Sequence, residues 1–146
     1  MESEIQLLKI LQKDASLSIR KLAEKLKMRP STVHERIKRL QRAGILKRKV
    51  WLIDAEKVGR DFVAFILLKG KPGNYLTERN ILADPRVQEA WGVTGSYDLL
   101  LKCRFRNVKE FSSFVMEIRE KLREYEVETF SMIATARLKE STEVPL

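Results

Sequence analysis

Residues 18–44, SIRKLAEKLKMRPSTVHERIKRLQRAG, decide how the first part of the chain folds. Apolar residues recur in this segment at three- and four-residue spacing, which predicts two short amphipathic helices. Residues 27–29 form the turn between them. Pro30 suits the first position of the second helix, because an N–H there has no intrahelical partner. Gly44 is a favourable left-handed stop for that helix.

The second of these helices has two contrasting faces. Val33, Ile37 and Leu40 fall on one side, and hydroxyl and cationic side chains fall on the other. One side can therefore pack on the first helix while the other faces outward. This is the layout of a helix-turn-helix, whose second helix enters the major groove of DNA. The alternative is a helical bundle with a solvated charged face, since such patterns match loosely.

Two kinds of DNA contact are expected from this helix, because phosphate contacts position a protein and base contacts specify the sequence. Glu35 could instead form an i,i+4 ion pair with Arg39. His34, the only histidine, could contact DNA or simply pack on the surface. The residues expected near base edges are Ser31, Thr32, Glu35 and Lys38. The cations expected near phosphates are Arg29, Arg36, Arg39 and Arg42.

The net charge of +9 is concentrated in one part of the 146-residue chain. Residues 1–60 hold 16 Lys and Arg against 7 Asp and Glu, whereas residues 61–146 hold 13 against 13. Cationic side chains displace condensed counterions from nucleic acid. The distribution therefore predicts a polyanionic partner, double-stranded DNA, for the first part only.

Composition is that of a soluble globular protein, with 44% hydrophobic and 34% charged residues. No apolar run approaches the ~20 residues of a membrane helix, and the N-terminus lacks the basic-then-apolar order of a signal peptide. The single Cys103 excludes an intramolecular disulfide and suits a reducing compartment. We therefore expect a cytoplasmic protein without a membrane partner. No metal-ligand cluster, cofactor motif or catalytic constellation is visible.

Flanking segments complete a DNA-binding domain over residues 1–50. Residues 3–13 predict a first helix, and Ser16 or Ser18 could cap the second. Strand-forming residues follow at 45–53, and a strand linker is expected at 51–60. A hairpin turn or wing within 45–53 would carry three cations that could touch the DNA backbone or remain solvated. These cations are Lys47, Arg48 and Lys49.

Residues 61–146 alternate strands and helices and form the second expected domain. Their order is βαββαβ, the split arrangement of ferredoxin-like domains, so the fold class is α+β. Both helices of such a unit cover one face of the sheet, and a second copy of the chain is the simplest partner for the other face. The expected strands are 62–69, 87–94, 97–105 and 127–138, and the expected helices are 74–83 and 108–123, with breaks at 70–73 and 95–96.

The chain resembles the Lrp/AsnC regulators, also called feast/famine regulatory proteins, over almost its whole length. The resemblance is carried by LQKDASLSIRKLAEKL (11–26), STVHERIKRL (31–40), AGIL (43–46), IDAEKVG (53–59), FILLKGKPG (65–73) and VTGSYDLLLKCR (93–104). It implies an N-terminal winged helix-turn-helix and a C-terminal RAM/ACT-like sensing domain. It also implies dimers that often assemble into octamers, and transcriptional control tuned by amino acids.

Two positions depart from the family pattern. Lys27 stands where the family often has glycine, which makes the turn conformation harder to adopt. Arg29 stands where a capping serine is common, which removes a side-chain acceptor for exposed N–H groups. We expect the added cations at the start of the helix to change the preferred DNA sequence.

The turn at residues 94–98 is the candidate small-molecule site. Gly95 permits a conformation that exposes backbone N–H groups to a carboxylate, and Asp98 could pair with an α-ammonium. Alternatively, Asp98 only braces a structural hairpin. The residues expected at the site are Thr94, Gly95, Ser96, Tyr97 and Asp98. The resemblance adds the last strand of a neighbouring chain, from which Thr129, Ser131 and Thr135 could contribute.

Two other functions compete with regulation by DNA binding. Sirohaem decarboxylases share the two-domain layout but rely on histidines, and residues 61–146 contain none. A sensing or oligomerisation module without specific DNA binding is the other alternative, and the charge of residues 1–60 argues against it. The sequence therefore favours a sequence-specific transcriptional regulator modulated by a small molecule.

Overall fold

The computed structural model describes residues 2–70 and 79–146, and it divides into two units. The first comprises Met1–Leu52 and Lys139–Leu146, and the second is Ile53–Leu138. The last eight residues, expected with the sheet domain, are thus grouped with the helices. Gln12 Nε2 donates to the carbonyl of Val144, and the Val144 N–H donates to Gln12 Oε1, both at 3.0 Å.

Three helices form the first unit: α1 (Glu2–Lys13), α2 (Ile19–Leu26) and α3 (Pro30–Arg42). They confirm the predicted three-helix arrangement within one or two residues at each end. The Ser18 hydroxyl accepts the Lys21 N–H at 3.3 Å and caps α2, whereas Ser16 bonds to Asp14. The buried residues of this unit are Leu7, Leu11, Leu22, Ala23, Val33 and Leu40.

The turn between α2 and α3 contains Lys27 and Arg29, the two residues that depart from the family pattern. Lys27 adopts a left-handed conformation with φ of 53°, which costs a non-glycine residue about 1 kcal/mol. Arg29 precedes α3 without a side-chain capping bond, and Pro30 begins the helix. Gly44 has φ of +71° beyond the end of α3, as a left-handed stop requires.

Residues 45–53 do not form the predicted strands or wing hairpin. The segment is irregular. Leu46 packs against the helical core, but the later apolar side chains stay in solvent; Trp51 is 91% exposed and Leu52 is 74% exposed. Strand-forming residues become a strand only when a neighbouring strand completes the hydrogen-bond ladder. Among residues 2–70 and 79–146, no strand pairs with residues 45–53, so the expected strand linker is an irregular connector.

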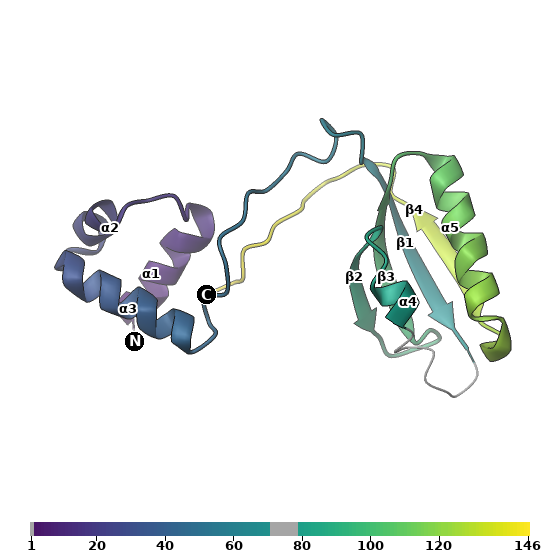
Figure 1. Ribbon diagram of the computed structural model, residues 1–146, viewed down its shortest axis with the longest axis horizontal. Helices are drawn as coiled ribbons and strands as arrows, with labels where there is room; N and C mark the ends of the chain where they lie inside the picture. The colour runs from purple at the N-terminus through teal and green to yellow at the C-terminus, as the bar shows by residue number, and fades with distance from the viewer. Residues whose placement is uncertain (1, 71–78) are drawn as a thin grey trace. The chain divides into compact units, whose positions relative to one another are not determined.

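The second unit is a four-stranded antiparallel sheet with the order β2-β3-β1-β4 (Figure 1). This confirms the predicted βαββαβ order. The first half of the helix expected at 74–83, and the break at 70–73 beyond Gly70, lie outside the described residues. The elements are β1 (Phe62–Lys69), α4 (Arg79–Leu82), β2 (Val87–Gly92), β3 (Leu99–Phe105), α5 (Val108–Lys121), the 3-10 turn η2 (Arg123–Tyr125) and β4 (Glu128–Ile133).

Alternation along the strands separates the two faces of the sheet. On one face Ala64, Ile66 and Leu68 of β1 lie opposite β3 residues that are also buried. Phe114 and Ile118 of α5 complete this core. The helices therefore cover one side of the sheet, as expected for a split βαββαβ unit.

The opposite face of the sheet carries a row of apolar side chains beside the ion pair of Lys102 with Glu89, and no helix of the described residues covers this face. Phe65 lies opposite Met132, and Leu67 lies opposite Phe130. Trp91 of β2 extends the same row, and its side chain is 59% exposed. We refer to these residues, with Leu100, as the open face.

Candidate nucleic-acid interface and sensing turn

The outward side of α3 presents polar and cationic groups over a buried apolar side. Val33 and Leu40 are buried against the other helices, which leaves the opposite side exposed. An open hollow of about 490 Å³ lies on this outward side. The structure thus brings together six residues predicted to contact DNA. They are Ser31, Thr32, Glu35, Arg36, Arg39 and Arg42.

Two arginines of α3 are held by the first turn of α1. Arg36 Nη1 donates to the Ser3 hydroxyl, and Arg39 Nη2 donates to the Glu4 carboxylate. The hydrogen bond from Arg39 lowers the pKa of Glu4. Arg39 therefore forms an ion pair with Glu4 of α1, whereas the sequence suggested a pair with Glu35 of its own helix. The sequence analysis did not predict that the start of α1 contacts α3. The acidic residues in the first turn of α1, Glu2 and Glu4, could have suggested ion pairs with the basic helix α3.

The remaining predicted DNA contacts lie around this hollow without lining it. His34 and Lys38 are exposed along α3, and Arg29 immediately precedes the helix. Lys47, Arg48 and Lys49 are exposed in the irregular segment, so they do not occupy a hairpin turn. Their charges remain within the first unit, close in sequence to the recognition helix.

The turn at residues 94–98, the candidate small-molecule site, has a specific backbone geometry. Gly95 has φ of +111°, a conformation that side chains rarely adopt. The Asp98 N–H donates to the Leu68 carbonyl at 2.9 Å, and the Asp98 carboxylate accepts the Gly70 N–H at 3.2 Å. Asp98 therefore braces the backbone, as the structural alternative predicted.

The three predicted contributors from the last strand occupy different positions. Thr129 lies opposite Leu68, at the same end of the sheet as the turn, and accepts hydrogen bonds from Arg119 at 3.0 and 2.8 Å. Ser131 lies two pairs further along β4, opposite Ile66. Thr135 lies beyond the opposite end of β4, so one chain does not bring it to the turn. The Tyr97 and Phe130 rings are 6.1 Å apart and connect the turn to β4.

Neither a membrane helix nor a metal cluster is found in residues 2–70 and 79–146. None of the helices there is both long and apolar enough to span a bilayer. No group of three or more His, Cys, Asp and Glu side chains in those ranges is placed to hold a metal ion. The pKa of the buried Cys103 thiol is raised to about 12 by burial, which keeps the thiol protonated at neutral pH.

Two protein-family models match the chain, one over its basic first part and one over its neutral second part. Residues 2–47 match a winged helix-turn-helix DNA-binding model, and residues 63–144 match the Lrp/AsnC ligand-binding domain. The HTH-type transcriptional regulator FL11 of Pyrococcus abyssi is 33% identical over 146 residues, covering 99% of this chain and 95% of that protein. The transcriptional regulator AzlB of Bacillus subtilis is 33% identical, covering 80% of this chain and 76% of its own.

Solved structures agree with these matches. An AsnC family transcriptional regulator from Agrobacterium tumefaciens shares the fold with a TM-score of 0.92 at 24% identity, covering 99% of this chain and 96% of that one. The regulator NMB0573 of Neisseria meningitidis, solved as a complex with L-Met, gives a TM-score of 0.88 at 26% identity with the same coverage. The chain therefore belongs to the Lrp/AsnC family of helix-turn-helix transcriptional regulators.

Proposed function

We propose that the protein regulates transcription by inserting α3 into the major groove of a specific DNA sequence. The observation that carries this proposal is the outward face of α3, where Ser31, Glu35 and Lys38 are all exposed in the basic part of the chain. Glu35 suits a cytosine amino group and Lys38 suits guanine. The flanking arginines supply phosphate contacts that fix the register of the helix.

The open face of the sheet supports a dimer as the DNA-binding species. Phe65, Leu67 and Phe130 form part of an apolar surface that the described residues of one chain cover only in part, and such surfaces mark association sites. A second copy presents the same apolar surface and would bury both. Two α3 helices related by a two-fold axis would then meet half-sites about one helical turn, ~34 Å, apart. Dimers of this kind could assemble further into octamers.

The effector we propose is an amino acid bound at residues 94–98. The Gly95 backbone suits a carboxylate, and a relative with this fold was solved with L-Met. Thr129 and Ser131 from β4 lie towards this end of the sheet, while Thr135 could reach it only from another copy. Binding would act through preference for one assembly state, in a cytoplasmic protein that binds rather than catalyses.

A gel-shift series tests the regulator proposal directly. The DNA is the region upstream of the protein's own gene, with unrelated DNA of equal length as the competitor. We expect higher affinity for the upstream DNA at every salt concentration, and a steep fall of both affinities with salt. Equal affinity for the two DNAs throughout the series would refute sequence-specific binding.

A further inference from the structure

One flank of α3 carries two of the arginines expected at DNA phosphates, and this flank meets the start of α1. At ~100° per residue, Arg36 and Arg39 lie between the buried row of Val33 and Leu40 and the outward side of the helix. Both arginines line the open hollow of about 490 Å³ on that outward side. Their guanidinium groups therefore border the surface that a duplex would meet.

Each of these two arginines bonds to a residue in the first turn of α1. Arg36 Nη1 donates to the Ser3 hydroxyl, and Arg39 Nη2 donates to Glu4 Oε1. The hydrogen bond from Arg39 lowers the pKa of Glu4, so this carboxylate is charged at neutral pH. Two adjacent residues of α1 therefore hold two residues on one flank of the recognition helix.

Arg39 keeps donors beyond the one that Glu4 accepts. A guanidinium group has five N–H donors in a planar fork, and the ion pair with Glu4 is made through Nη2. The side chain of Arg39 is 62% exposed, whereas that of Glu4 is 26% exposed. The remaining nitrogens of Arg39 can therefore donate to a phosphate while Glu4 keeps its bond.

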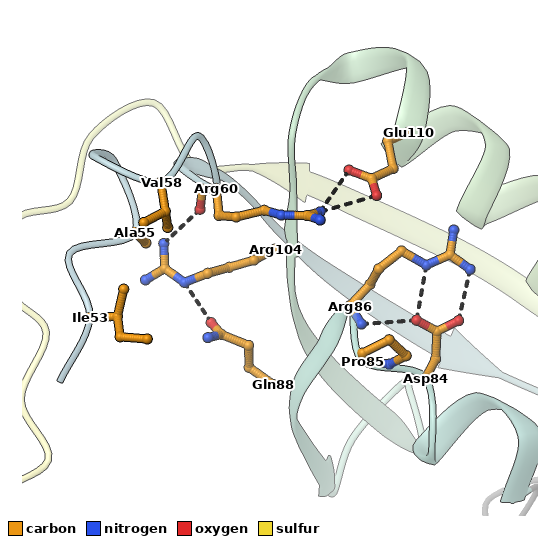
Figure 2. Close-up of a pocket in the computed structure, with 10 residues that line it drawn as sticks. All are labelled: Ile53, Ala55, Val58, Arg60, Asp84, Pro85, Arg86, Gln88, Arg104 and Glu110. Atoms are coloured by element: carbon orange, nitrogen blue, oxygen red, sulfur yellow. Dashed lines mark hydrogen bonds and ion pairs between the residues drawn. The ribbon is translucent and has the colours of Figure 1, made fainter. Parts of the chain in front are cut away.

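Arginines of the sheet unit show how differently a purely structural arginine is held. Arg86 donates to Asp84 at 2.7 Å and to Glu117 at 2.6 Å, and its guanidinium stacks on the ring of Phe114 at 4.6 Å. Figure 2 shows Arg86 turned towards Asp84, and its side chain is only 21% exposed. Arg39 is instead held on one side and open on the other. Three arginines line the cavity of about 620 Å³ drawn in Figure 2, beside the connector: Arg60, Arg86 and Arg104.

Other cations of α3 are not held in this way. Among residues 2–70 and 79–146, no hydrogen bond or ion pair anchors the side chain of Lys38 or of Arg42. Ordering a long side chain when a partner binds reduces the affinity. Arg39 has already lost part of its freedom in the free protein, so its contact with DNA should be less costly and should occur at a fixed position.

We propose that Glu4 is a positioning residue for DNA recognition, which holds Arg39 ready for one phosphate and so fixes the register of α3. The inference deepens the proposed function and rests on it. Register decides which base edges meet Ser31 and Glu35, because phosphate contacts position a protein and base contacts specify the sequence. The Glu4 carboxylate also repels phosphates, so it lowers the affinity for any duplex on which Arg39 finds no matching phosphate.

Gel shifts of the full chain with the upstream DNA and with the unrelated DNA of equal length test this inference. In Glu4→Ala we expect about three- to tenfold weaker binding of the upstream DNA, because Arg39 must then be ordered on binding. Binding of the unrelated DNA should become tighter, because an anionic group has been removed. The control Glu2→Ala removes an equal charge from the same turn of α1 and should leave the ratio of the two affinities unchanged.

A double-mutant cycle assigns the effect to the pair of Glu4 and Arg39. Arg39→Gln alone should weaken the binding of both DNAs, because a phosphate contact is lost. Adding Glu4→Ala to Arg39→Gln should not weaken the binding of the upstream DNA further. Thermal unfolding of Glu4→Ala and Glu2→Ala should agree closely, since a surface ion pair contributes little stability. A loss of specificity in Glu4→Ala then reports on recognition and not on folding.

Two results would overturn the inference while leaving the regulator proposal intact. The first is wild-type discrimination between the two DNAs that Glu4→Ala retains in full, which would mean that Glu4 only competes with DNA for Arg39 or only supports the fold. The second is a loss of upstream binding on Glu4→Ala that is equally large in the Arg39→Gln background. Equal affinity of the wild type for the two DNAs would overturn the regulator proposal and this inference with it.

Discussion

The DNA-binding unit and the sheet unit differ both in the size of their cores and in what their surfaces expose: among the described residues, 11 buried apolar residues form the core of the sheet unit and 6 form that of the helical unit. Residues 1–60 carry all of the excess positive charge, while residues 61–146 balance 13 cations with 13 anions. The first unit exposes cations around α3, and the second exposes an apolar sheet face. The difference shows how one short chain can separate attraction to a polyanion from association with itself.

The largest expected effect comes from disturbing the two cores one at a time. Leu7 and Leu101 are fully buried in separate clusters, so truncation to alanine should cost about 2–5 kcal/mol in either case. We expect Leu7→Ala to destabilise only the helical unit and Leu101→Ala only the sheet. Hydrogen exchange followed by mass spectrometry on peptides from each unit would measure this. Equal loss of protection in both units would show that the two fold as one.

Charge reversal in each unit sharpens the electrostatic contrast. Lys38→Glu with Arg39→Glu should weaken DNA binding by well over tenfold and flatten its salt dependence, because fewer counterions are released. The matched control, Lys109→Glu with Arg123→Glu, makes the same charge change on exposed positions of the sheet unit. Gel shifts over a salt series would compare the two. Similar losses in both variants would mean that overall charge, not α3, governs binding.

Helix caps offer a matched comparison of smaller size. The Ser18 hydroxyl caps α2, and the Asn107 side chain accepts the Glu110 N–H at 3.0 Å to cap α5. Alanine at either position should cost about 1 kcal/mol. Urea unfolding, monitored separately for each unit, should assign each loss to the unit that holds the cap. A loss of DNA affinity in Asn107→Ala at a temperature where it remains folded would argue against independent units.

Acid should weaken the sheet unit through Asp84. Hydrogen bonds from Arg86 lower the pKa of Asp84 in the folded state. The associated stability is therefore present above the ordinary aspartate pKa and is lost as pH falls through the lower folded value. The measurement compares the free energies of unfolding of the wild type and Asp84→Asn near neutral pH and at about pH 3. We expect the wild type to lose more stability than the variant between the two pH values. A wild type and variant with the same pH dependence would contradict the assignment.

The smallest effect concerns one strained residue in each unit. Lys27 and Glu126 both adopt left-handed conformations, with φ of 53° and 49°. Glycine at either position should stabilise its own unit by about 0.5 kcal/mol, because the left-handed penalty disappears while some unfolded-state entropy is added. Thermal unfolding would show a small rise for each variant. A fall at position 27 would mean that the lysine side chain has a stabilising contact of its own.

The helices and most strands could be predicted because their signals are local. The apolar spacing of residues 18–44 indicates a helical period and a buried face, and the short apolar run of Phe62–Lys69 indicates a strand. The strands at 45–53 could not be judged in this way, since propensity says nothing about a missing partner strand. The docking of Val144 on Gln12 depends on residues 132 positions apart, which no local pattern encodes.

The residues of the candidate site can also be separated into those that a local pattern predicts and those that depend on the tertiary structure. The exposed side of α3 follows from helical period alone, so its residues were found together. The pairing of Arg39 with Glu4 joins two helices and was not predicted. The position of Thr135 depends on where β4 ends, and the cavity at Arg60 and Arg104 depends on how the connector folds. Both require the tertiary structure.

Amide chemical-shift mapping with a DNA duplex from the upstream region tests the central claim most directly. We expect the largest shifts along residues 29–42, at the exposed positions Ser31, Glu35 and Lys38, with the amides of β1 and β3 unchanged. Shifts of equal size along the strands, or none at those three positions of α3, would contradict the separation of DNA binding from the neutral sheet.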